Sequence, residues 1–155
     1  MAIEIKRILL PTDFSAYSAT ATKYACELAT KFEAELHLLH TLEVHLSSTP
    51  IFGMGLDLPK YVHESKGAAE KALAGVLDPQ WAVGRKVVQA VVEGSPKVEI
   101  IRYARTHEID VIVLATHGRT GLAHVLIGSV AESVVRTAPC PVLTVRPEGH
   151  QFVMP

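Results

Sequence analysis

The residues with the clearest chemical potential lie in a glycine-marked loop in the last third of the chain. Residues 115–121 read Ala-Thr-His-Gly-Arg-Thr-Gly, and nine residues separate Gly118 from the pair Gly128-Ser129. Glycine permits positive φ and a close approach of the backbone to a ligand. A helix that begins at Gly128 presents unpaired N–H groups and a partial positive charge, which suit phosphate. The spacing therefore indicates a phosphate-binding loop, to which the Ser129 hydroxyl adds a hydrogen bond.

The same glycines also fit a purely structural interpretation. Gly118 and Gly121 could simply shape a turn, and Ser129 could simply cap a helix. No lysine follows Gly128, so the loop lacks the lysine clamp of a P-loop. The dinucleotide fingerprint, three close glycines after the first strand, is also missing. From spacing alone the two interpretations stay open.

The elements that would position this loop alternate between strands and helices. Short apolar or valine-rich runs predict strands over residues 7–11, 34–41, 86–92, 109–115 and 142–145. Apolar residues at helical spacing, with Ser or Pro near the starts, predict helices from residue 15 onward and over 59–75, 95–107 and 128–137. The third of these helices is expected to turn Val98, Ile101 and Ala104 inward. A break is expected at Asp78-Pro79.

This alternation predicts a fold class. It favours an α/β fold with a doubly wound, five-stranded parallel sheet, helices on both faces and a single domain. Ligands of such sheets bind beyond the carboxyl ends of the strands, where the strand order reverses. Residues 115–121 leave a strand at that edge. Residues 42–57 are expected to form a second, long loop, of a length that is often functional.

Composition and charge narrow the class of protein. The chain has 155 residues, 48% hydrophobic and 20% charged, which is typical of one globular domain. Fifteen Lys and Arg against sixteen Asp and Glu give a net charge of −1, which does not encourage binding to nucleic acid or to an anionic membrane. Cys26 and Cys140 predict reduced thiols. Without a recognisable signal peptide or spanning segment, we expect a cytoplasmic protein.

Three segments together resemble the universal stress protein family. They are residues 110–146, residues 8–15 (Ile-Leu-Leu-Pro-Thr-Asp-Phe-Ser) and residues 94–96 (Gly-Ser-Pro). The likeness covers nearly the whole chain. It implies an adenine nucleotide alpha hydrolase-like, Rossmann-like domain over residues 1–147, followed by a tail over residues 148–155.

Nucleotide-binding members of that family carry Gly-x-x-Gly, nine residues, and then Gly-Ser or Gly-Thr. Gly118, Gly128 and Ser129 match this pattern, whereas Ala115 stands at the first glycine. If that position needs positive φ, alanine would cost about 1 kcal/mol or more. The resemblance implies ATP or AMP as ligand, with or without Mg²⁺. It implies a nucleotide site made of Pro11, Thr12, Asp13, Thr41, Leu114, Ala115, Thr116, His117, Gly118, Arg119, Gly128, Ser129 and Val130.

Two further expectations concern metals and assembly. The chain has eight histidines, but His37 and His40 point to opposite faces of a strand and no pair has the helical spacing of a zinc site, so no side-chain metal site is expected. A short apolar strand is expected at an edge of the sheet, where exposed strands invite pairing. The resemblance implies a homodimer through this strand, with an edge shielded by the tail as the alternative. Its residues are Val142, Leu143, Thr144 and Val145.

With the resemblance, the sequence predicts an adenine-nucleotide-binding protein of the stress response. It would act as a sensor or regulatory module, engaging a protein partner that the sequence does not identify. One alternative is a slow ATP hydrolase, although no base or lysine clamp is evident beside the phosphates. Another is a dimeric scaffold that has lost nucleotide binding, which the alanine at position 115 keeps open.

Overall fold

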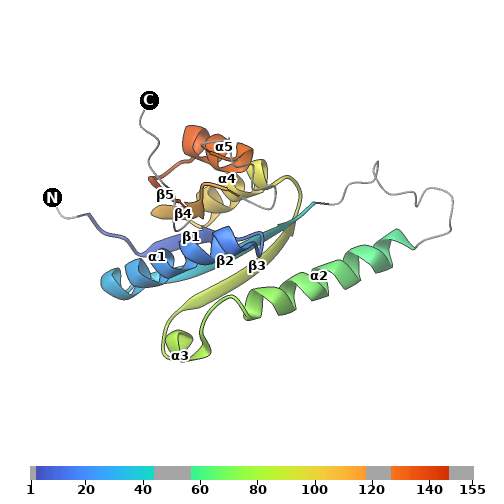
Figure 1. Cartoon of the computed structure of the whole chain (residues 1–155), viewed down its shortest axis with the longest axis horizontal. Coiled ribbons are helices and arrows are strands. Elements are labelled where there is room, and N and C mark those ends of the chain that lie inside the picture. The colour runs from blue at the N-terminus through green and yellow to red at the C-terminus, as the bar shows by residue number, and fades with distance from the viewer. Residues whose placement is uncertain (1–2, 44–56, 118–126, 147–155) are drawn as a thin grey trace.

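The computed structural model describes residues 3–43, 57–117 and 127–146, and its core is a parallel sheet between two layers of helices (Figure 1). The five strands pair in the order β3-β2-β1-β4-β5, all parallel. They are β1 (Arg7–Pro11), β2 (Glu35–Leu42), β3 (Val87–Glu93), β4 (Val111–Ala115) and β5 (Val142–Val145). The helices are α1 (Ala16–Phe32), α2 (Leu58–Ala74), α3 (Pro79–Ala82), α4 (Pro96–Thr106) and α5 (Ser129–Thr137). The predicted fold class is confirmed.

Alternating side chains of the strands build one hydrophobic core on each face of the sheet. Ile8 and Leu10 of β1 belong to the core beneath α1 and α2, whereas Leu9 belongs to the core beneath α4 and α5. The two-residue period of a strand explains the division, and burial on both faces explains the continuous apolar runs. Figure 1 shows α4 and α5 together on one side of the sheet, with α2 on the other.

The direction of the crossovers sets the place of a ligand site. α1 and α5 follow the neighbouring strands β1 and β4, but they pack on opposite faces of the sheet. The strand order therefore reverses between β1 and β4. In open α/β sheets the crevice at this point, beyond the carboxyl ends of the strands, is where ligands bind.

The structure corrects two local predictions. The predicted break at Asp78-Pro79 contains the short helix α3, because the Asp78 carboxylate accepts a hydrogen bond from the Gln80 N–H at 2.8 Å and Pro79 suits a first helical position. Val98 was expected inside but is 51% exposed. Ile100, Ile101, Tyr103 and Ala104 fill the buried side of α4 instead.

Glu99, rather than Val98, is the buried residue in the first turn of α4. Its carboxylate is buried against Gly94 and pairs with Arg102, with Nη1 and Oε1 2.6 Å apart. Gly94 has φ +140°, and a Cβ there would lie 2.8 Å from the Glu99 side chain. Both the backbone angle and the close approach therefore require glycine at this strand-to-helix turn.

Candidate functional site

The turn after β1 holds a set of polar groups in a fixed shape at the carboxyl edge of the sheet. The buried Thr12 donates its N–H to the Leu39 carbonyl at 2.9 Å, and its Oγ1 accepts the Phe14 N–H at 3.1 Å. The Asp13 carboxylate accepts the Ser15 N–H at 3.0 Å. Ser15 in turn caps α1 by accepting from the Ser18 N–H. The turn is therefore ordered by its own side chains, and it keeps Asp13 half-buried at the sheet edge.

A second polar turn leaves β4, the neighbouring strand. The buried Thr116 donates its N–H to the Val145 carbonyl of β5 at 2.9 Å, and its own carbonyl accepts the Gly128 N–H. Since Gly128 is the N-cap of α5, these two bonds fix the start of α5 beside the end of β4. The structure thus brings Thr116 and Gly128 together, as the phosphate-loop interpretation requires.

The first turn of α5 offers backbone donors at this edge. Gly128 has extended angles (φ −69°, ψ 156°), so the helix proper begins at Ser129, which is exposed, and Val130, which is half-buried. The first intrahelical bond runs from the Glu132 N–H to the Gly128 carbonyl. Helix geometry leaves the N–H groups of Ser129 and Val130 without intrahelical acceptors, and they can donate to an anion.

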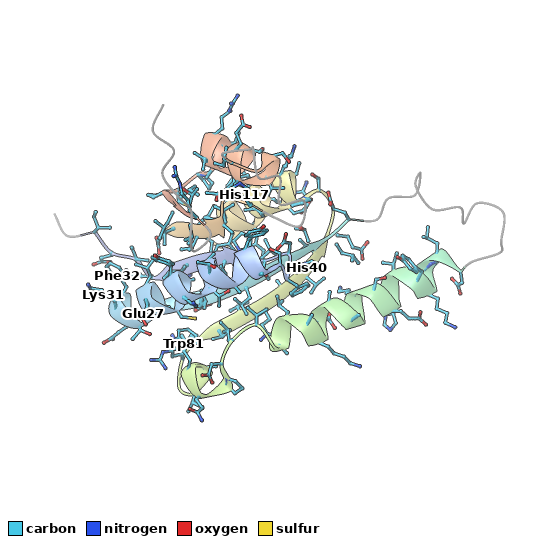
Figure 2. The ribbon with its side chains drawn as sticks, viewed as in Figure 1. Glu27, Lys31, Phe32, His40, Trp81 and His117 are labelled. Carbon is cyan, nitrogen blue, oxygen red and sulfur yellow. The ribbon has the colours of Figure 1, made fainter. Side chains whose placement is uncertain are left out.

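The start of α1 and the end of β4 face each other across the switch point. The rings of Tyr17 and His117 are 6.0 Å apart between centroids, and His117 Nδ1 lies 2.9 Å from Thr116 Oγ1. Figure 2 shows His117 and His40 toward one end of the sheet, and Glu27, Lys31 and Phe32 toward the other. The two tilted rings lie between the turn after β1 and the turn after β4.

Ala115 occupies an ordinary backbone conformation. It ends β4 in register with Val145, and the described non-glycine residues with positive φ are Phe14, Glu33 and Glu108. The alanine at the position of the family's first glycine therefore carries no strain from a left-handed backbone conformation. Its side chain packs against the core on the α1 side of the sheet.

The other predicted site residues lie at different depths. Thr41 is the penultimate residue of β2, which runs one residue further than predicted, and it is half-buried beside Val92 of β3. Pro11 ends β1. Leu114 is 4% exposed and packs in the core beneath α4 and α5, so it lies below the surface of the candidate site. Gly118, Arg119, most of the loop 42–57 and the tail 148–155 lie outside the described residues.

Metal ligands and reactive thiols are not gathered in the described part of the chain. There, no three His, Cys, Asp or Glu side chains are placed to hold a metal ion. His37 and His40 point to opposite faces, as predicted: His37 contacts Tyr103 of α4, whereas His40 stacks on Phe14. Burial raises the pKa of the Cys26 thiol to about 11 and also raises that of Cys140, so neither carries much reactive thiolate near neutral pH. Within the described ranges no helix has the length and apolar character needed to cross a bilayer.

Sequence reasoning did not assign Tyr17, Phe14 or His40 to this edge. Tyr17 lies in the first turn of α1. The hydrophobic pattern of that helix predicts only which side of it faces the core. His40 meets the turn after β1 through contacts that join distant parts of the sequence. A histidine at the penultimate position of a predicted strand was the one available signal, and it does not identify a partner.

β5 is an edge strand of the sheet, as predicted. Leu143, at its centre, is 38% exposed, while Val145 is buried. Among the described residues β5 pairs with β4 alone, so its outer edge is short and apolar and carries the exposed Leu143.

The sheet order defines a doubly wound, Rossmann-like α/β domain, and the two facing turns lie at its switch point, where ligands bind in open α/β sheets. The family model of the universal stress proteins matches residues 4–146. The chain is 34% identical over 146 residues to universal stress protein MJ0531 of Methanocaldococcus jannaschii, an alignment that spans 91% of this chain and 82% of that one. The chain therefore belongs to the universal stress protein family.

Solved structures agree with this assignment. Protein MJ0577 of Methanocaldococcus jannaschii superposes with a TM-score of 0.81 at 30% identity, over 96% of this chain and 100% of that one. A universal stress protein from Archaeoglobus fulgidus in complex with dAMP superposes with a TM-score of 0.55 at 17% identity, over 92% and 98% of the two chains. The second likeness shows the shared fold alone.

Proposed function

We propose that this chain binds an adenine nucleotide at the carboxyl edge of its sheet and acts as a sensor or regulatory module in the stress response. The observation that carries the proposal is the first turn of α5, held by Thr116 beside the polar turn of β1 at the switch point. The dAMP bound by the Archaeoglobus fulgidus relative supports the ligand class.

Each part of the nucleotide has a partner of suitable chemistry. The phosphates would accept hydrogen bonds from the N–H groups of Ser129 and Val130, favoured by the helix dipole. The Asp13 carboxylate would accept a hydrogen bond from a nucleoside hydroxyl or amino group, and Thr41 would contact the base. ATP and AMP both satisfy this arrangement.

Mg²⁺ fits this edge as a companion of the phosphates. A protein-held divalent ion needs several oxygen ligands, and the described residues do not gather three acidic or histidine side chains in one place. An ATP-bound ion would instead keep its phosphate and water ligands, with Asp13 as a nearby carboxylate. The magnesium would neutralise phosphate charge.

Assembly through β5 is the second part of the proposal. A homodimer would pair the exposed β5 edges of two copies and cover Leu143. Thr116, which fixes the start of α5, is bonded to Val145 of the same strand. A nucleotide that shifts Thr116 would therefore act directly on the dimer edge, which gives the regulatory module a physical route from ligand to partner.

The experiment begins with the nucleotide content of the purified protein, released by denaturation and separated by anion exchange. Calorimetric titration with ATP then compares wild type, Ser129→Ala and Ser129→Pro. Proline at this position removes one amide donor without breaking the helix, because Gly128 is extended and α2, α3 and α4 each carry proline in their first turn.

Loss of one N–H bond to a charged phosphate is expected to weaken ATP binding about tenfold or more in Ser129→Pro relative to Ser129→Ala. Equal affinities would show that the Ser129 N–H does not bind the phosphates. An absence of binding to wild type at millimolar ATP would favour the nucleotide-free scaffold. Phosphate release that Ser129→Pro abolishes would favour the slow hydrolase.

A further inference from the structure

His40 joins β2 to the turn that follows β1. It is 6% exposed, and its Nδ1 lies 2.8 Å from the Thr12 carbonyl oxygen. Since a carbonyl can only accept, Nδ1 must carry a proton and donate it. The imidazole ring also stacks on the Phe14 ring, with centroids 4.4 Å apart and an interplanar angle of 29°. One buried side chain thus contacts two residues of the turn.

The turn it contacts holds an unfavourable backbone conformation. Phe14 has φ 63°, in the left-handed region that costs a non-glycine residue about 1–2 kcal/mol. Such strain persists where surrounding contacts determine the conformation, and it concentrates at functional sites. The local bonds of Thr12 and Asp13 stabilise the turn from within. His40 supports it from outside, at the Thr12 carbonyl and at the Phe14 ring.

We propose that His40 is a positioning residue for the nucleotide: its hydrogen bond and ring stack hold Thr12 and Phe14 so that the Asp13 carboxylate faces the nucleoside. This inference rests on the proposed function. His40 would act through the turn, without touching the ligand. Its consequence is that a buried residue of β2 sets the affinity of the site through the turn that follows β1.

A matched control lies on the same strand. His37 is 3% exposed, and its Nδ1 is hydrogen-bonded to the Tyr103 hydroxyl at 2.9 Å on the opposite face of the sheet. Replacing either histidine removes a buried imidazole whose Nδ1 makes a hydrogen bond, so a general loosening of the sheet would affect both variants alike. Positioning of the nucleotide predicts an effect of His40 alone.

The experiment measures ATP affinity and amide hydrogen exchange in four proteins. They are wild type, His40→Phe, which keeps a ring but loses the donor, His40→Asn, which keeps a donor near the Nδ1 position, and His37→Phe. Circular dichroism first establishes that each is folded. His40→Phe is expected to weaken ATP binding about tenfold, since it leaves the Thr12 carbonyl without its donor, while His40→Asn and His37→Phe stay within about threefold of wild type.

The unliganded proteins supply a readout that does not depend on the ligand. The N–H groups of Phe14 and Ser15 are hydrogen-bonded within the turn. Their hydrogen exchange should be faster than wild type in His40→Phe and equal to wild type in His37→Phe. If His40→Phe does not fold, Phe14→Leu removes the other half of the ring stack and is expected to weaken ATP binding about threefold.

Two results would overturn the inference alone: wild-type affinity in folded His40→Phe, or equal losses in His40→Phe and His37→Phe. Failure of wild type to bind ATP would instead overturn the proposed function, and the positioning role would fall with it.

Discussion

The two ends of the sheet are built differently. At the amino end, charged groups are paired with backbone: the Asp110 carboxylate accepts the N–H groups of Lys6 and Arg7 at 2.7 and 2.8 Å. Arg7 is also bonded to Glu108 and to the His107 carbonyl. At the carboxyl end, the donors of Ser129 and Val130 remain directed out of the helix start. The amino end is closed by its own polar groups, while the carboxyl end keeps helix-start donors that the proposed nucleotide would use.

Chain connections follow this division in part, since the links over residues 12–15 and 94–95 are short although they lie at the carboxyl end. Short links, residues 33–34, 107–110 and 138–141, enter β2, β4 and β5 at the amino end. Long links, residues 43–57 and 116–128, leave β2 and β4 at the carboxyl end. Short links leave little room for insertions, whereas long loops above a rigid scaffold commonly carry function. The difference teaches that stability and binding in this fold can be tested separately, one end at a time.

The largest effect on stability is expected at the amino end, from Asp110→Ala. The substitution leaves two backbone N–H groups without their charged acceptor and should lower the free energy of unfolding by about 2 kcal/mol. Urea denaturation measures this loss. ATP affinity should stay within about twofold of wild type, since the site lies at the other end, and a parallel tenfold loss of affinity would break the division between the two ends.

Asp13→Asn makes the complementary change at the carboxyl end. The amide keeps an oxygen to accept the Ser15 N–H, so the turn and the stability should be retained, while the charged acceptor for the nucleoside is lost. We expect ATP affinity to fall about tenfold, as for one hydrogen bond to a charged group. Calorimetric titration measures the ATP affinity, and urea denaturation measures the stability. Unchanged affinity would show that Asp13 does no more than shape its turn.

The buried His37 gives the amino end a pH dependence. Burial lowers the pKa of its imidazole, partly opposed by the Glu35 carboxylate 3.0 Å from Nε2, while the positive charges of His107 and Arg7 lower it further. That contact with Glu35 lacks hydrogen-bond geometry. Tyr103, bonded to His37 and stacked on His107, completes the groups that face it. The folded chain therefore binds a proton at His37 less readily than the unfolded chain does.

The sign of the effect follows by linkage. Stability is full above the unfolded histidine pKa of about 6.5 and falls as pH drops below it toward the lowered folded value, by up to about 1.4 kcal/mol per pH unit. Urea curves at pH 7.5 and 5.5 should show this loss in wild type and a smaller one in His37→Asn. His63→Asn, which removes an exposed histidine, should behave as wild type. A loss that His37→Asn leaves unchanged would place the sensitive group elsewhere.

The smallest effects are expected from Ala115→Gly. Because Ala115 has no positive φ, glycine relieves no strain, and its extra freedom should cost about 0.5–1 kcal/mol of stability. ATP affinity should stay within about twofold of wild type. A tenfold gain measured by titration would instead mean that the methyl group obstructs the phosphates, and that the family's glycine serves close approach.

Local sequence predicts much of this fold, whereas the candidate site depends on contacts between distant parts of the sequence. β1 was predicted to the residue, because its apolar run ends at Pro11 and a polar turn follows. α3 was missed because an aspartate–proline pair both breaks one helix and begins another. β4 begins at Val111 rather than Ile109, because Asp110 is engaged with Lys6 and Arg7 across the sheet.

The site divides in the same manner. Gly128 and Ser129 were predicted from the glycine spacing before a helix start, whereas Thr12 and Asp13 were assigned through the family resemblance. The link from His40 to Thr12, and the facing rings of Tyr17 and His117, join residues brought together by strand order and crossover direction. No periodicity or spacing contains that information.

The most direct test of the account is an ATP titration followed by the backbone amide resonances of the whole chain. We predict shifts at the carboxyl end, at Thr12, Asp13, Thr116, Ser129 and Val130, with the amides of Lys6, Arg7 and Asp110 unmoved. Shifts centred on the amino end, or none at millimolar ATP, would contradict the assignment of this edge as the nucleotide site.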